Sequence, residues 1–233
     1  MALAPWVASA ASAAGRRVRT AVVVDGAAGA EEDSAPAVVA TLEVAVHPAA
    51  GESTVDGVWT RLWRCVRHRW ADESDTRKVI DAAMLERLAS RVAASERRHT
   101  GEVRIYVEAS LPLSYLWRHL RDATPVTQLV RERATAMFGH LRVWDTEHNN
   151  GVLIYLLLTE HEIELVADRG LNQLVSAGQW QEMVGHMGAA FAQGRFEDGL
   201  TQALAEVSAP LVQHFPADAE PNANALPDTP VLG

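Results

Sequence analysis

The pattern of apolar and polar positions is strongest between residues 145 and 170. An unbroken apolar run, residues 152–158, follows a polar loop that ends in a glycine. A run of that length, rich in branched residues, is typical of a strand buried on both faces. After a polar break at residues 159–162, apolar residues return. Because the connection is so short, the pattern predicts an antiparallel hairpin that pairs residues 151–159 with residues 162–168.

Other periodicities place elements around this hairpin. Residues 102–108 alternate between apolar and polar side chains, which predicts a half-buried strand. Residues 76–95 and 125–140 carry apolar residues at helical spacing, and residues 109–124, which begin and end near prolines, are interpreted as a loop. Two further helices are expected over residues 180–191 and 196–211.

The order of these elements indicates the fold class. Strand 102–108, helix 125–140 and strand 151–159 form a right-handed crossover, so the two strands should be parallel. The hairpin then adds an antiparallel strand. The sequence therefore predicts an α/β fold, a three-layer α/β/α sandwich with a small mixed parallel and antiparallel sheet.

Both ends of the chain differ from this central domain, residues 76–216. Residues 1–57 are interpreted as a disordered extension that folding does not need, because their short valine runs have no periodic partner. An alternative is that the natural start lies downstream of this segment. The first fourteen residues are rich in alanine but lack a basic start, so they are not interpreted as a signal peptide. The proline-containing residues 217–233 are expected to be a disordered tail.

Residues 58–75 form a lead-in to the domain, and residues 58–70 have an unusual composition. They hold three of the seven tryptophans and four arginines, without an acidic residue. One interpretation is a basic, aromatic surface that contacts an anionic membrane or a protein partner. The alternative is a short helix whose tryptophans cap the core of the domain.

Charge and cysteine content narrow the function classes. The formal net charge of −9 comes mainly from the ends, since residues 1–57 contribute −4 and residues 217–233 contribute −3. The remaining, nearly neutral part is unsuited to nucleic acid, which rewards a strongly basic face. The single cysteine, Cys65, allows neither an internal disulfide nor a cysteine-based zinc site. Without an apolar run of membrane-spanning length, the expected location is cytoplasmic or peripheral to a membrane.

The common catalytic signatures are missing. The sequence has no Gly-x-Ser-x-Gly motif, no glycine-rich phosphate loop and no dinucleotide fingerprint. His161-Glu162 lacks the second histidine of a zinc protease helix, and Cys65 lacks the arginine of a cysteine phosphatase loop. The other histidines are scattered. The candidate chemistry is therefore carried by oxygen-bearing side chains.

Oxygen-bearing residues meet at one end of the expected sheet. The start of one hairpin strand and the end of the other lie together, so Asn150 should be close to Asp168. Asp145, Glu147 and Asn149 stand two apart as in a calcium loop, but the following positions exclude an EF-hand. An all-oxygen set favours calcium, magnesium or manganese over zinc. The expected metal ligands are Asp168, Asn150, Asp145 and Glu147, and the expected substrate contacts are Glu102, Gly151, Arg169 and Gly170.

The glycines, the loop residues and the carboxylates at this sheet end have both functional and structural interpretations. Glycines at positions 151 and 170 would let a ligand approach the backbone. However, Asn, Asp and Gly are also common in ordinary loops at strand ends. Two carboxylates about 5 Å apart repel by about 3 kcal/mol at an effective dielectric near 20. A cluster of them is therefore stabilised by a cation, by a proton or by a nearby arginine such as Arg169.

Several separated motifs resemble the TPM domain, in its compact bacterial, phosphatase-like branch. They are Asn149-Asn-Gly-Val-Leu-Ile-Tyr-Leu156, Glu164-Leu-Val-Ala-Asp-Arg-Gly170, His99-Thr-Gly-Glu-Val-Arg-Ile-Tyr-Val-Glu108, Phe191-x-x-Gly-Arg-Phe-Glu-x-Gly-Leu200 and His214-Phe-Pro216. The resemblance covers residues 76–216 and implies the same layered fold. The family is associated with divalent-ion binding and, in thylakoid relatives, with acid phosphatase activity and photosystem repair. At the matching motifs, the resemblance implies that Asn150, Gly151 and Asp168 are site residues.

Three functions follow as hypotheses. The first is a domain that binds calcium or magnesium through oxygen ligands and hydrolyses phosphoric esters. The second is a non-enzymatic module that binds a protein partner or a membrane. The third is a purely structural domain. A metal titration followed by thermal melting separates the first from the others.

Overall fold

The computed structural model describes residues 17–23, 40–47, 56–70, 73–176, 178–180, 182–183, 190–191, 193–217 and 226–233. The elements are β1 (Arg17–Val23), β2 (Ala40–His47), α1 (Asp56–Trp70), α2 (Glu73–Val79), α3 (Ala82–Glu96), β3 (Val103–Glu108), α4 (Leu113–Asp122), α5 (Val126–His140), β4 (Val152–Leu157), β5 (Glu162–Ala167), α6 (Arg169–Asn172), α8 (Phe196–His214) and β6 (Val231–Leu232). The helix expected over residues 180–191 lies largely outside the described residues.

The described strands form one sheet in the order β1-β2-β5-β4-β3-β6. Strand β4 pairs in parallel with β3, so that Val103 lies opposite Val152. It pairs antiparallel with β5, so that Val152 also lies opposite Ala167. The predicted antiparallel hairpin and the predicted parallel pairing of β3 with β4 are therefore both confirmed.

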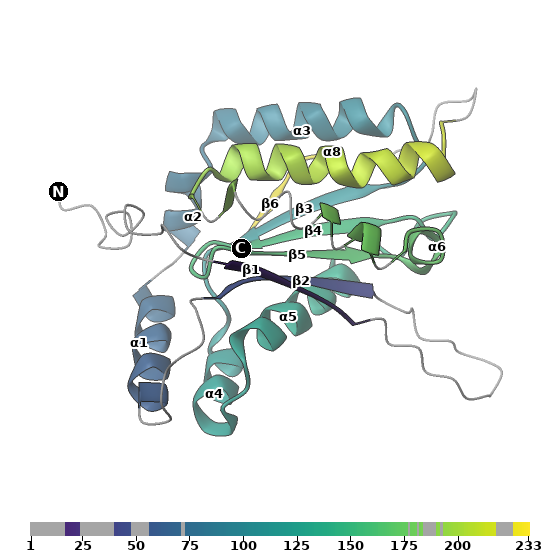
Figure 1. Cartoon of the computed structure of the whole chain (residues 1–233). Coiled ribbons are helices and arrows are strands. Elements are labelled where there is room, and N and C mark those ends of the chain that lie inside the picture. The colour runs from purple at the N-terminus through teal and green to yellow at the C-terminus, as the bar shows by residue number, and fades with distance from the viewer. Residues whose placement is uncertain are drawn as a thin grey trace.

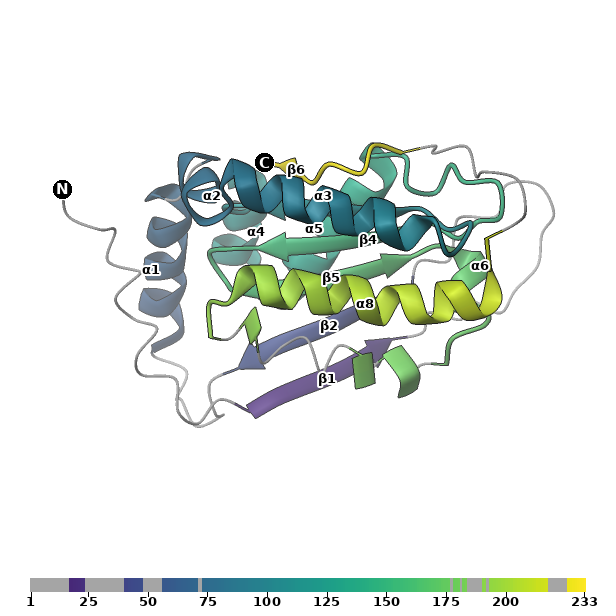
Figure 2. The same ribbon diagram turned by 90° about the horizontal axis from the view of Figure 1, so that it is seen from above.

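Helices cover both faces of the sheet (Figures 1 and 2). Helices α3 and α8 pack on one face, where their apolar side chains join alternate residues of β3, β4 and β5 in one hydrophobic core. Helix α5 covers the other face with a second core that contains Leu129, Phe138, Leu153 and Tyr155. The chain thus has the predicted three-layer α/β/α arrangement, in which each sheet face is buried against helices.

The structure also describes strands toward both ends of the chain. The sequence interpretation expected a disordered extension over residues 1–57. The structure describes two strands within it, of which β1 pairs with β2 and β2 pairs with the hairpin strand β5, more than a hundred residues later. That folding does not need residues 1–57 stays a prediction. The expected tail is also partly ordered, since residues 231–232 form β6 beside β3.

Two central assignments also change. Strand β3, expected to be half-buried, is buried at every position, as is β5. Helix α5 covers the polar face of β3, and its Arg133 pairs with Glu108. Residues 109–124 are not only a loop, since they contain α4. Helix α4 follows Pro112 and ends at Ala123 in the left-handed conformation (φ 54°). Its buried residues Leu116 and His119 are three apart, which fixes one face of the helix on the domain.

The C-terminal segment is held at the edge of β3. The N–H of Gly233 donates to the carbonyl of Val107 at 2.9 Å. The N–H of Leu226 donates to Oε2 of Glu102 at 3.3 Å. Asp228 shares a side-chain hydrogen bond with Glu96, the last residue of α3. Burial, with the charges of Glu102 and Asp228, raises the pKa of Glu96 to about 8.

We expect Glu96→Gln to stabilise the protein above pH 8, by on the order of 1–2 kcal/mol. A carboxyl with a raised folded-state pKa binds more protons in the folded chain, so stability falls as the pH rises from about 4.5 to about 8. Glutamine removes that dependence and can still accept the Val103 N–H bond, now 2.9 Å. Urea unfolding at several pH values measures the effect, and Glu86→Gln on the exposed face of α3 is the control. A variant less stable at every pH would contradict the expectation.

Candidate functional site

The two ends of the β4–β5 hairpin strands meet opposite the turn, as the sequence predicts. The N–H of Asp168 donates to the carbonyl of Gly151 at 2.9 Å, and the N–H of Gly170 donates to that of Asn149 at 2.9 Å. Asn149 adopts a left-handed conformation (φ 51°), which turns the chain from the loop into β4. The backbone of residues 149–151 and 168–170 is therefore one connected unit.

Asp168 lies between β5 and the short helix α6. Its Oδ1 accepts the backbone N–H of Arg169 at 2.6 Å, so the carboxylate caps α6. The residue is 2% exposed, and its buried Oδ2 has no hydrogen-bond partner among the residues that the structure describes. Burial raises the pKa of Asp168 against the opposing effects of the Arg169 N–H and charge. Half of this carboxylate therefore lacks the partner that a buried anion requires.

Asn150 is the second residue at this end whose oxygen is not satisfied. Its backbone N–H donates to the hydroxyl of Thr146 at 3.1 Å, and its side-chain Nδ2 donates to the hydroxyl of Thr100 at 3.3 Å. The residue is fully buried, and its Oδ1 has no hydrogen-bond partner within the described part of the chain. Most buried polar atoms are paired, so an orphaned oxygen needs an explanation.

The sequence did not predict that Thr100 and Thr146 orient Asn150. Thr100 follows His99, whose ring nitrogens contact Ser95 Oγ at 2.9 Å and the Gly101 carbonyl at 3.0 Å. Burial lowers the pKa of His99 to about 4, so the ring is neutral at neutral pH. The sequence signal that could have indicated Thr100 is the motif His99-Thr100-Gly101, because it lies immediately before β3.

Gly151 and Gly170, the two glycines expected to contact substrate, pack closely against the protein backbone. A Cβ on Gly151 would lie 1.9 Å from the Val143 carbonyl oxygen, and a Cβ on Gly170 would lie 2.5 Å from the Asn149 carbonyl oxygen. Both distances are far below ordinary contact. The absence of side chains at these positions is therefore explained by backbone packing.

The other expected residues divide into two groups. Glu102 reaches the same sheet end, since its carbonyl accepts the Val152 N–H at 2.8 Å, and its buried carboxylate accepts the Leu226 N–H. Arg169 donates from Nε to Asn149 Oδ1 at 3.2 Å. Asp145 and Glu147 lie on the exposed loop, where Asp145 pairs with Arg142.

The donor set determines which cations this end could hold. Within the described residues, no group of three or more His, Cys, Asp or Glu side chains is arranged to hold a metal ion. A cation would need amide, carbonyl or water oxygens beside Asp168. Such ligands suit calcium and magnesium, and they do not suit zinc.

The fold and the site define an α/β/α domain with oxygen-bearing residues at one end of a mixed sheet. The TPM domain family profile matches residues 74–209, and the chain belongs to this family. No curated protein matches the chain. The NMR structure of the BA42 protein from the psychrophilic bacterium Bizionia argentinensis is similar, with 24% identity, a TM-score of 0.56, and coverage of 66% of this chain and 95% of that one. This likeness supports the fold.

Proposed function

We propose that the domain binds a divalent cation, calcium or magnesium, at the sheet end formed by residues 149–151 and 168–170. The observation that carries the proposal is a pair of buried oxygens, Asp168 Oδ2 and Asn150 Oδ1, that have no hydrogen-bond partner among the described residues. Asp168 would supply the charge and Asn150 a neutral oxygen. A cation would offset the desolvation that raises the pKa of Asp168.

The surrounding residues support a hard cation. Calcium accepts carboxylate, amide and carbonyl oxygens together with water, and magnesium usually keeps several waters. Asp145 and Glu147 are exposed on the adjoining loop and can interact through such waters. Gly151 and Gly170 allow the two backbone segments to pack closely, which fixes the positions of the ligands.

Phosphoric ester hydrolysis is the activity proposed for this site, and it rests on the family relationship. A bound divalent cation polarises a phosphoryl oxygen and activates water. Arg169 is exposed and adjacent to Asp168, so its guanidinium can contact a phosphate group. Glu102 already accepts a hydrogen bond from Leu226, and its role is to hold the C-terminal segment near the same end.

We expect millimolar calcium or magnesium to raise the melting temperature of the full chain. A cation that binds only the folded state adds about 2.7 kcal/mol at a hundredfold excess over its dissociation constant. Asp168→Asn should keep the cap of α6, because asparagine also caps helices, while most of the metal response disappears. Differential scanning fluorimetry with and without a chelator measures both effects.

The matched control is Asp81→Asn, which makes the same change at the cap of α3, where Asp81 accepts the Met84 N–H at 2.7 Å. This variant should retain the full metal response. Asn150→Ala should weaken it, and combining it with Asp168→Asn should add little if both oxygens serve one ion. An equal metal response in Asp168→Asn and the parent would overturn the proposed site.

Hydrolysis is tested separately with p-nitrophenyl phosphate as a generic ester. Metal-dependent cleavage that disappears in Asp168→Asn and persists in Asp81→Asn would support the enzymatic part of the proposal. A metal-dependent melting shift without cleavage of the ester would remove that part and leave a cation-binding domain.

A further inference from the structure

Helix α1 exposes its apolar side chains to solvent. Trp59 is 70% exposed, Trp63 71% and Trp70 81%, and Leu62 and Val66 between them are also exposed. The tryptophans and Val66 are spaced by four, three and four residues, so they form one stripe along the helix. A surface helix of a globular domain normally turns such a stripe toward the core.

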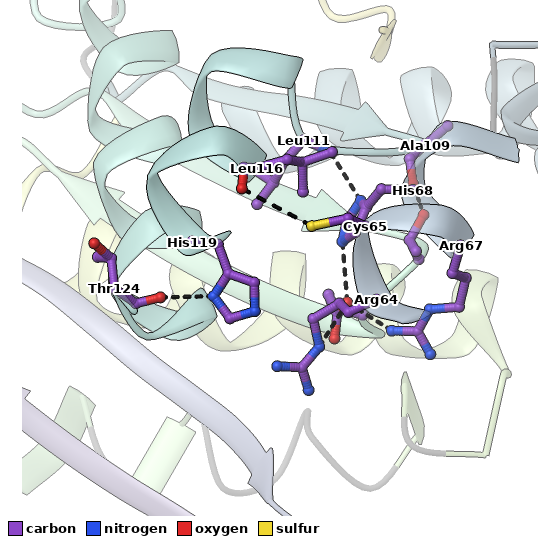
Figure 3. A network of polar contacts seen from close by, with 11 residues as sticks. Arg64, Cys65, Arg67, His68, Ala109, Leu111, Leu116, His119 and Thr124 are labelled. Carbon is purple, nitrogen blue, oxygen red and sulfur yellow. Dashed lines mark hydrogen bonds and ion pairs between the residues drawn. The ribbon is translucent and has the colours of Figure 1, made fainter. Parts of the chain in front are cut away.

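The opposite side of α1 attaches the helix to the domain through polar contacts (Figure 3). Oε1 of Glu160, in the β4–β5 turn, lies 2.6 Å from Arg67 Nη2, 3.0 Å from His68 Nε2 and 3.4 Å from Arg64 Nε. The other ring nitrogen of His68 accepts the backbone N–H of Leu111 at 3.2 Å. Helix α1 is thus held by its polar side.

The charge of Glu160 makes this attachment persistent at neutral pH. Burial opposes ionisation of Glu160, but the His68 hydrogen bond and the guanidiniums of Arg64 and Arg67 outweigh it and lower its pKa to about 2. Rotating the tryptophans inward would break these ion pairs. The polar contacts therefore fix the outward orientation of the stripe.

The surroundings of the stripe are basic and aromatic. From residue 57 to residue 70 the chain contains four arginines and no acidic residue, and Arg69 is exposed beside the stripe. Helix α4 packs next to α1, with Cys65 Sγ 3.9 Å from the Leu116 carbonyl. It exposes a second apolar pair, Leu113 at 68% and Trp117 at 62%.

These features favour the interface of an anionic membrane over a protein groove as the occupant. Tryptophan places an apolar ring and a polar N–H at the boundary between acyl chains and headgroups. Arginines beside an apolar stripe extend toward anionic headgroups, to which their charge is complementary. Within the described residues, no helix is long and apolar enough to cross a membrane. Contact along the membrane surface therefore fits a helix of this length.

We propose that α1 lies in the interface of an anionic lipid membrane through Trp59, Trp63 and Trp70, while Glu160 and its cationic partners hold the domain on the aqueous side. This function is separate from the proposed cation site. The earlier alternative, in which the tryptophans cap the core, disagrees with their exposure.

The test measures co-sedimentation of the full chain with phosphatidylcholine vesicles that contain roughly one-third phosphatidylglycerol. A chelator is present throughout, so that metal bridging cannot contribute. Binding should be strong at about 0.02 M salt and weak at about 0.3 M, because the Debye length shortens several-fold. Pure phosphatidylcholine vesicles should bind much less. The tryptophan emission should shift to shorter wavelength on binding.

Two kinds of variant isolate the surface. Combined Trp59→Ala, Trp63→Ala and Trp70→Ala should abolish detectable binding, whereas Trp144→Ala, in the turn after α5 and 46% exposed, should bind as the parent does. Arg69→Gln, an exposed single change, should weaken binding about fivefold and remains informative if the triple variant is unstable. The proposal is overturned by absent binding at low salt, by unchanged binding of the triple variant, or by a dimer in solution that the triple variant converts to a monomer.

Discussion

Replacing Gly151 by alanine is expected to lower the free energy of unfolding by about 3 kcal/mol, at the upper end of the usual cost of overpacking. The added Cβ would lie 1.9 Å from the Val143 carbonyl oxygen and 3.1 Å from Val143 Cγ1. The main obstacle is backbone, so no change of side-chain rotamer relieves it. Urea unfolding of parent and variant measures the difference.

A second glycine provides the matched control. Gly139 lies near the end of α5, and an alanine Cβ there would meet no atom of the described residues within 4 Å. Gly139→Ala should therefore stabilise the protein by about 0.5–1 kcal/mol through higher helix propensity. If Gly151→Ala were as stable as the parent, the loop before β4 would not pack on the sheet as described here.

The second large effect is expected at the buried ion pair beneath α5. Arg133 donates to both oxygens of Glu108, at 2.7 and 3.0 Å, and the Tyr155 hydroxyl donates to Glu108 at 2.6 Å. Burial and the nearby Glu108 charge raise the pKa of Tyr155 well above its ordinary value, so Tyr155 remains a neutral donor. Glu108→Leu should cost about 3–5 kcal/mol, because it leaves a largely buried guanidinium without its partner.

The double variant distinguishes loss of a partner from loss of packing. Adding Arg133→Met to Glu108→Leu should restore much of the stability, since two apolar groups can replace a buried pair. The exposed pair of Arg121 and Asp122 is the control, and Asp122→Asn should leave the stability nearly unchanged, because solvent screens an exposed ion pair. A double variant no more stable than Glu108→Leu would show that the pair is not the reason for the loss.

The sequence specified the central fold where the signal is local. The apolar run 152–158 and the short polar break after it predict the hairpin, and the helical spacing of residues 125–140 predicts α5 with its bounds nearly unchanged. Strands β1 and β2 could not be predicted in this way, because β2 joins the sheet through the distant strand β5 and β1 joins it through β2. The polar side chains of β3 likewise suggested a wet face, because their partner Arg133 lies on another element.

The candidate site was predictable in position and less so in detail. Hairpin geometry alone brings Asn150 and Asp168 to the same sheet end. The role of Gly151 depends on where Val143 passes, which no local pattern encodes. The hydroxyls of Thr100 and Thr146 were not predicted for the same reason, since each reaches Asn150 through tertiary packing. The orientation of α1 depends on Glu160, ninety-three residues after Arg67.

The two residues of β6 have a consequence for self-association. Over Tyr106 and Val107, β6 occupies the edge of β3, which would otherwise offer unpaired backbone groups to another chain. So short a strand can detach by local opening, without unfolding of the domain. The aggregation rate of the native protein would then depend on how often β6 detaches from β3. Two variants with the same free energy of global unfolding could therefore aggregate at very different rates.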